Sequence, residues 1–153
     1  MFKKIIIVIF LFFLTVKCQA GFKEAGIKIE FPKAFNLKGY ADFEFWPNAG
    51  IELGLGFIFS KDKPILNPEL NYYNNFYEYG SFFTKVHAGI YAFVPMGSEE
   101  SFLAGSIKLD LGYRSEGGTA ASFNPGMLFA PQAKESYENF FLPDFGVSLG
   151  QRF

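Results

Sequence analysis

The last nine residues of the chain, Phe145–Phe153, read FGVSLGQRF and decide the fold. Apolar and polar side chains alternate along them, which is the period of a β-strand with one apolar and one polar face. The chain stops on the apolar parity, at an aromatic ring. The apolar parity carries Phe145, Val147, Leu149 and Phe153, and the other carries Gly146, Ser148, Gly150 and Arg152.

The same alternation recurs upstream, in segments separated by turns and polar loops. Segment 102–114 shows it most clearly, with Leu103 and Ile107 opposed to Lys108 and Asp110. No segment after residue 20 has the period of a helix, so the sequence predicts an all-β protein of eight antiparallel strands. The fourth strand has no clean parity, and Asn-Pro-Gly interrupts the seventh. The expected strands are 24–31, 37–46, 51–59, 71–83, 84–94, 102–114, 123–130 and 140–153.

The first 20 residues have the composition of an export signal. Lys3 and Lys4 precede an apolar run at 5–16, and Cys18-Gln19-Ala20 supplies small residues before a cleavage point. The run is too short to cross a bilayer as a helix, which needs about 20 residues. We expect residues 1–20 to be a signal peptide and residues 21–153 to form one domain that contains the eight strands.

The single cysteine, Cys18, leaves two outcomes open. Cleavage after Ala20 removes it, whereas a lipoprotein-type cleavage would make it the lipidated first residue, although Lys17 departs from the small residue expected before such a cysteine. Cleavage after Ala20 removes three lysines and no acidic residue, so the net charge falls from −1 to −4. Nucleic acid is therefore not an expected partner, because its binding normally needs a basic surface.

Alternation alone does not separate a membrane barrel from a soluble β-sandwich, since both have one apolar face. Three features favour lipid. An export signal occurs together with a terminal Phe, bulky aromatics such as Phe45, Trp46 and Phe59 lie near strand ends, and charges of both signs lie in mid-strand on the polar parity. In an eight-stranded barrel that parity faces a narrow interior that side chains fill.

The whole pattern resembles the small eight-stranded bacterial outer-membrane barrels, the family of the membrane domain of outer membrane protein A and the OmpX group. The ending Phe145–Phe153 carries the resemblance, because a C-terminal Phe on the lipid-facing side is the family's assembly signal. The resemblance implies an antiparallel up-and-down transmembrane barrel in the outer membrane.

Residues that could carry catalysis are few. His87 is the only histidine, and the residue two positions after it is Gly89, whereas lipid A deacylases of this architecture have a Ser there. We interpret His87 as a polar group of the interior. Asp42 with Glu44, and Glu30 with Glu52, could form carboxylate pairs for acid–base chemistry. We interpret them instead as partners of the interleaved lysines, which are Lys28, Lys38 and Lys108. The sequence predicts no catalytic, cofactor or metal site.

The expected function is therefore structural, or surface contact with a host or envelope partner. Residues 60–70 and 131–139 are the longest polar insertions, and we expect them to form loops that make this contact. A lipid-modifying enzyme is the alternative, and a small solute channel is a weaker one because eight strands leave little free lumen. We expect a monomer in contact with outer-membrane lipid.

Overall fold

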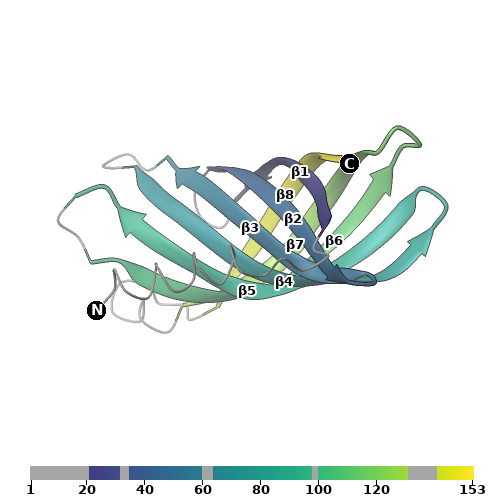
Figure 1. Cartoon of the computed structure of the whole chain (residues 1–153). Coiled ribbons are helices and arrows are strands. Elements are labelled where there is room, and N and C mark those ends of the chain that lie inside the picture. Colours follow the sequence, from purple (N-terminus) through teal and green to yellow (C-terminus); the bar gives the residue numbers. More distant parts are fainter. Residues whose placement is uncertain (1–20, 32–34, 60–63, 98–99, 131–140) are drawn as a thin grey trace.

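The structure is a computed structural model that describes residues 21–31, 35–59, 64–97, 100–130 and 141–153. These residues form eight strands, each antiparallel to its neighbours in sequence, and β8 pairs with β1 to close a barrel (Figure 1). The expected all-β barrel of eight strands is confirmed. The strands are β1 (Gly21–Glu30), β2 (Asn36–Trp46), β3 (Ala49–Ile58), β4 (Ile65–Tyr79), β5 (Phe82–Pro95), β6 (Phe102–Arg114), β7 (Thr119–Phe129) and β8 (Phe141–Arg152).

No helix among the residues that the structure describes is long and apolar enough to cross a membrane.

The two parities of each strand face opposite sides of the barrel wall, as the sequence predicts. Ile107 is 66% exposed on the outside, whereas its neighbour Lys108 is 2% exposed on the inside. In the last strand, Val147 and Leu149 face outward and Gly146 and Gly150 face inward. Other exposed apolar side chains of the outer wall are Ile27, Leu37, Leu55, Ile90, Leu103, Leu111 and Met127.

The fourth strand corrects the sequence interpretation. Residues 60–70 were expected to form a loop, but β4 begins at Ile65, and Glu69 lies in the interior at 5% exposure. The prediction was wrong because the two prolines of this segment, Pro64 and Pro68, were taken as a sign of a loop. Pro68 has no N–H to donate to a neighbouring strand. It pairs with Leu55 of β3, but on the β5 side the paired positions pass from Leu66↔Val94 directly to Glu69↔Tyr91. The ladder to β5 thus has a gap where the proline stands.

A β-bulge in β4 explains why residues 71–83 lack a clean parity. The β4–β5 register shifts between Asn75 and Tyr77, so the alternation before the bulge does not continue after it. Tyr73 is 1% exposed inside the barrel, whereas Phe76 and Tyr77 are both exposed. The segment expected at 71–83 is in fact the second half of β4, a turn at Gly80, and the start of β5.

Pairing of consecutive strands gives the barrel two unlike ends. The turns β2–β3, β4–β5 and β6–β7 lie at one end together with the start of β1 and the end of β8, and we call this the turn end (Figure 1). Asn48, Gly80 and Gly118 there have positive φ, which tight hairpin turns require. The connections β1–β2, β3–β4, β5–β6 and β7–β8 lie at the opposite, loop end. Residues 131–139, and the expected signal peptide at 1–20, lie outside the described residues.

Exposed aromatic rings gather near both ends of the outer wall. At the turn end Phe153 is 74% exposed, its ring stacks on Phe22 at 5.2 Å between centroids, and its backbone N–H donates to the Lys23 carbonyl at 2.9 Å. At the loop end Phe35 lies between Phe31 and Phe59, at 5.8 and 5.9 Å. Two aromatic belts of this kind are typical of barrels whose ends meet the two membrane interfaces.

The β1–β8 seam depends on close approach of the two backbones. Its register runs over seven pairs, and Gly26 lies opposite Gly150 beneath the ring of Tyr40. A Cβ added at Gly26 would lie 2.2 Å from the carbonyl oxygen of Leu149. At this spacing of β1 and β8, the seam has no room for a side chain at position 26.

Candidate functional site

The barrel interior holds most of the charged side chains of the described wall, and it is the site that the fold builds. Near the turn end, Lys85 lies 2.7 Å from Asp42 and 3.9 Å from Glu24. The carboxylate of Glu24 also accepts hydrogen bonds from Arg114 at 3.0 Å and from the Tyr40 hydroxyl at 2.8 Å. Two cations and two carboxylates thus form one neutral group.

In the middle of the barrel, His87 lies between two carboxylates. Its Nε2 is 3.0 Å from Asp110 and its Nδ1 is 3.8 Å from Glu52, and the side chain is 1% exposed. Glu52 also pairs with Lys28 and accepts a hydrogen bond from Asn71 at 3.1 Å. The structure therefore places His87 in the interior, within an ionic group, and both of its polar partners among the described residues are carboxylates.

A third ionic group lies on the loop side of the middle. Lys38 bridges Glu30, at 2.7 Å, and Glu69, and its side chain is 0% exposed. Lys108 bridges Glu30 and Asp144, the latter at 2.6 Å. Two lysines thus share three carboxylates, and the contacts join β1, β2, β4, β6 and β8 across the interior.

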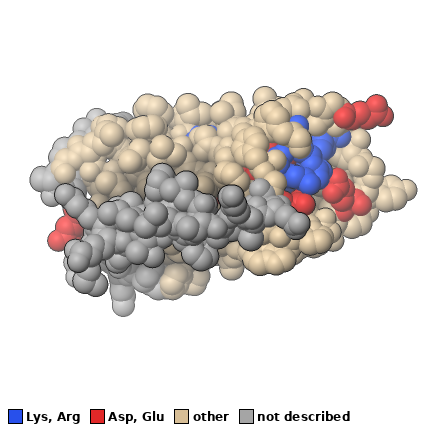
Figure 2. Space-filling view, in the orientation of Figure 1, with Lys and Arg blue, Asp and Glu red and all other residues tan. Residues whose placement is uncertain are grey.

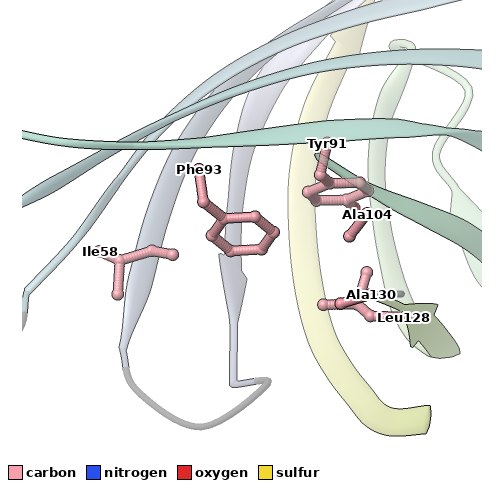
Figure 3. Close-up of a cluster of buried hydrophobic side chains, with 6 residues drawn as sticks. All are labelled: Ile58, Tyr91, Phe93, Ala104, Leu128 and Ala130. Carbon is pink, nitrogen blue, oxygen red and sulfur yellow. The ribbon is translucent and has the colours of Figure 1, made fainter. Parts of the chain in front are cut away.

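The ring of Tyr91 separates the ionic groups from an apolar layer. The ammonium groups of Lys38 and Lys108 lie 4.1 and 4.8 Å from its centroid, within cation–π range. Toward the loop end follows a cluster of buried apolar side chains that point into the barrel (Figure 3). The cluster consists of Ile58, Tyr91, Phe93, Ala104, Leu128 and Ala130, with Ile65, Phe102 and Leu142 packed against it.

Charges at the turn end are more exposed. Figure 2 shows Lys and Arg gathered there together with Asp and Glu on the face in view. Glu78 accepts from Arg114 at 3.3 Å and lies 3.6 Å from Arg152. Lys23 pairs with Glu44 at 3.2 Å, with both side chains partly exposed.

The carboxylate pairs singled out in the sequence are not brought together. Asp42 pairs with Lys85 inside, while Glu44 pairs with Lys23 at the turn end. The expected lysine partners are confirmed for Glu30, with Lys38 and Lys108, and for Glu52, with Lys28. The sequence analysis did not identify Lys85 as the partner of Asp42.

Glu69 and Asp144 are interior carboxylates that the sequence interpretation missed. Glu69 was assigned to a loop, and Asp144 stands beside Pro143 at the start of the last strand. Glu69 lies two positions from the inward-facing Asn71, and Asp144 lies two positions from the inward-facing Gly146. Because residues two apart in a strand share a face, this spacing could have assigned both carboxylates to the interior.

No group of three or more His, Cys, Asp or Glu side chains in the described part of the chain is arranged to hold a metal ion. The interior carboxylates are instead engaged by lysine, arginine or histidine, as the three ionic groups show. Buried charges are tolerated when they are paired in this way.

No protein-family model and no curated protein matches the sequence. Solved structures do match. The N-terminal β-barrel domain of Pseudomonas aeruginosa OprF superposes with a TM-score of 0.60 at 16% identity, over 84% of this chain and 94% of that domain. The chain has the fold of a small transmembrane β-barrel. The expected resemblance to the outer membrane protein A type of barrel is thus confirmed for the fold.

Designed proteins share this transmembrane barrel fold. A barrel from the de novo design of transmembrane β-barrels gives a TM-score of 0.57 at 11% identity, over 88% of this chain and 98% of that one. The solution structure of the designed TMB2.3 gives 0.58 at 13% identity, over 90% and 98%. Because natural and designed proteins share the transmembrane barrel, the fold alone does not assign a function.

Proposed function

We propose that the protein is an outer-membrane barrel with a closed lumen, which contacts envelope or host partners through its loop end. The observation that carries this proposal is the division of a closed wall into an apolar outside and an ion-paired inside. A protein dissolved in water rarely leaves an apolar patch of more than a few hundred Å² exposed. Here apolar side chains such as Ile27, Ile90 and Ile107 cover the outer wall between the two aromatic belts.

Arginine at Ile107 tests the membrane location. Ile107 lies in mid-strand on β6 and is 66% exposed, so Ile107→Arg would place a charge in hydrocarbon. We expect the free energy of unfolding in lipid vesicles to fall by about 2–4 kcal/mol. The matched control is Tyr79→Arg at the β4–β5 turn, where an interfacial arginine should cost about 0–1 kcal/mol. Equal, small effects at both sites would mean that water surrounds the wall.

Two layers of side chains inside the barrel support the proposal of a closed lumen. The ionic groups occupy the turn half and the middle, and Phe93 and Leu128, at 9% and 2% exposure, belong to the apolar layer at the loop half. Opening a path for ions would need both layers to move, and an eight-stranded barrel has little room for that. We expect the protein to give a flat current trace in planar bilayers. Current steps of constant size would contradict a closed lumen.

The surroundings of His87 support a role without catalysis. A histidine that activates a nucleophile needs that nucleophile within hydrogen-bond reach, whereas the polar partners of His87 among the described residues are Asp110 and Glu52. We therefore propose that the protein is not a lipid-modifying enzyme. Lipid A that is altered in a deletion strain, and restored by the wild-type gene but not by His87→Gln, would overturn this.

The loop end is the proposed contact surface. The two polar insertions singled out in the sequence connect β3 to β4 and β7 to β8, so both join strands at that end, although the first is confined to residues before Ile65. In outer-membrane barrels the short turns face the periplasm and the longer loops face outward. Together with the expected export through residues 1–20, this topology supports a position of residues 60–64 and 131–139 at the cell surface.

Trypsin applied to intact cells tests that orientation. Lys61, Lys63 and Lys134 stand in the two insertions, whereas Arg114 and Arg152 lie at the turn end. We expect cleavage after Lys61 and Lys134 but not after Lys63, because Pro64 follows it. We expect none after the arginines, because the membrane shields the turn end. Lys134→Gln should remove the fragment that begins at residue 135 and leave the others unchanged. Cleavage at Arg114 with intact lysines would reverse the orientation.

A further inference from the structure

A hollow of about 800 Å³ lies on the outer wall over β5, β6 and β7, and its volume is within the usual size of ligand sites. Its floor is formed where two outward positions, Ala88 on β5 and Gly105 on β6, carry little or no side chain. Larger apolar groups, among them Val86, Met127 and Phe129, border it. Elsewhere on the same strands, bulky side chains such as Ile90 and Leu111 stand outward.

An interrupted ladder lies within the hollow. The β6–β7 register passes from Lys108↔Gly126 to Leu111↔Phe123 without the two pairs between them, and Pro125 stands in that gap. Proline has no N–H for the ladder. Both Pro125 and Leu109, the residue that faces the gap from β6, line the hollow. The hollow therefore coincides with an interruption of the β6–β7 ladder as well as with small side chains.

The chemistry of the hollow is apolar. Ser106 and Lys108 border it, but their side chains are 6% and 2% exposed and belong to the interior. The outward groups are aliphatic, aromatic or thioether, and Met127 can adjust its shape to an irregular ligand. None of the described residues that line the hollow presents an outward charge that could recognise a polar group.

We propose that this hollow is a binding site for one acyl chain of a bilayer lipid, held more firmly than the chains along the rest of the wall. The inference rests on the proposed membrane location. The hollow is continuous with the apolar wall that hydrocarbon would cover, and an unfilled hollow there would forfeit the dispersion contacts of its lining. A long, flexible and unbranched chain can enter a depression that bulky side chains border on both sides.

Filling the floor of the hollow tests the proposal. A Cβ added at Gly105 would have its nearest neighbours at 3.9–4.0 Å, which is ordinary contact, so Gly105→Leu should fold and occupy the space. The matched control is Gly39→Leu on β2, which is also outward and would meet no atom within 4 Å. Heat-modifiable migration on a gel verifies that each variant is folded, and Ala88→Leu replaces Gly105→Leu if the latter does not fold.

The measurement is native mass spectrometry of the barrel released from micelles that contain palmitoyl-oleoyl phosphatidylethanolamine. We expect the wild type and Gly39→Leu to retain one lipid, and Gly105→Leu to bind it about tenfold more weakly, the effect of excluding roughly two methylene groups from contact. Equal retention by all three proteins would overturn the inference. A dimer that Gly105→Leu abolishes would overturn it in favour of a second copy of the chain as occupant.

Failure of the membrane location can be distinguished from failure of this site. If Ile107→Arg carries no penalty in vesicles, the proposed function fails and the lipid site with it. If Ile107→Arg carries the expected penalty but Gly105→Leu retains lipid as well as the wild type does, only the acyl-chain site is wrong.

Discussion

Lys38→Met is expected to lower the free energy of unfolding by about 3–5 kcal/mol, the cost of breaking a buried ion pair. The Lys38 side chain is 0% exposed and bridges Glu30 and Glu69, and its ammonium lies 4.1 Å from the centroid of the Tyr91 ring. Methionine has a similar length but no charge, so both carboxylates lose their shared cation. Urea titration in lipid vesicles, followed by the fluorescence of the single tryptophan Trp46, measures the effect.

Two further variants control this experiment. Lys23→Met removes a partly exposed lysine paired with Glu44, and such pairs are worth about 0–1 kcal/mol. Adding Glu69→Gln to Lys38→Met should restore part of the lost stability, because one uncompensated carboxylate disappears. A loss for Lys38→Met no larger than that for Lys23→Met would mean that water reaches the interior and screens these charges.

Gly26→Val is expected to prevent the barrel from closing, or to destabilise it by at least about 3 kcal/mol, the upper range for overpacking. The new Cβ would meet the Leu149 carbonyl oxygen at 2.2 Å and the Gly150 Cα at 2.6 Å. Because both obstacles are backbone atoms of β8, the two strands would have to separate along their seven paired positions. Loss of the fast-migrating folded band on an unboiled gel reports this result.

Gly39→Val is the control for the seam. Gly39 lies on β2, the neighbour of β1 opposite to β8, and pairs with Ile27. It faces outward, and a Cβ added there would have no atom within 4 Å. It should fold like the wild type, since valine suits a strand better than glycine does. Two variants with equal migration would show that close approach at Gly26 does not limit closure.

Most of the architecture was predictable because it depends on alternation, which is local. Segment 102–114 was predicted at the bounds that β6 has, and parity puts Val147 and Leu149 on the same face of β8. The aromatic strand ends and the mid-strand charges then identified that face as the outer one. Eight strands with short connections then leave an up-and-down barrel as the simplest arrangement. The charged residues of the inward parity could also be assigned to the interior from the sequence.

The exceptions are positions where alternation fails or is ambiguous. Pro68 and the bulge between Asn75 and Tyr77 hid the true extent of β4, because each alters the ladder without any signal in hydropathy. The apolar interior layer was missed because Ile58, Phe93 and Leu128 are as apolar as their outward neighbours. Once both faces are apolar, periodicity cannot tell lumen from lipid.

Individual ion partners could not be assigned from the sequence either. Lys85 and Asp42 are 43 positions apart, and Lys108 and Glu30 are 78 apart. Which cation meets which carboxylate depends on the tilt and stagger of the strands around the barrel, and these are properties of the closed cylinder rather than of any one strand.

The third ionic group has a consequence for how the chain enters a bilayer. Lys108 on β6 is neutralised by Glu30 on β1 and Asp144 on β8, strands from opposite ends of the sequence. A hairpin of β5 and β6 that crossed hydrocarbon alone would carry Lys108 without either counter-ion, and its edge N–H and C=O groups would also lack partners. The unpaired charge of Lys108 therefore opposes insertion of one hairpin at a time. It favours concerted insertion, in which β1 and β8 pair before the strands enter the acyl-chain region.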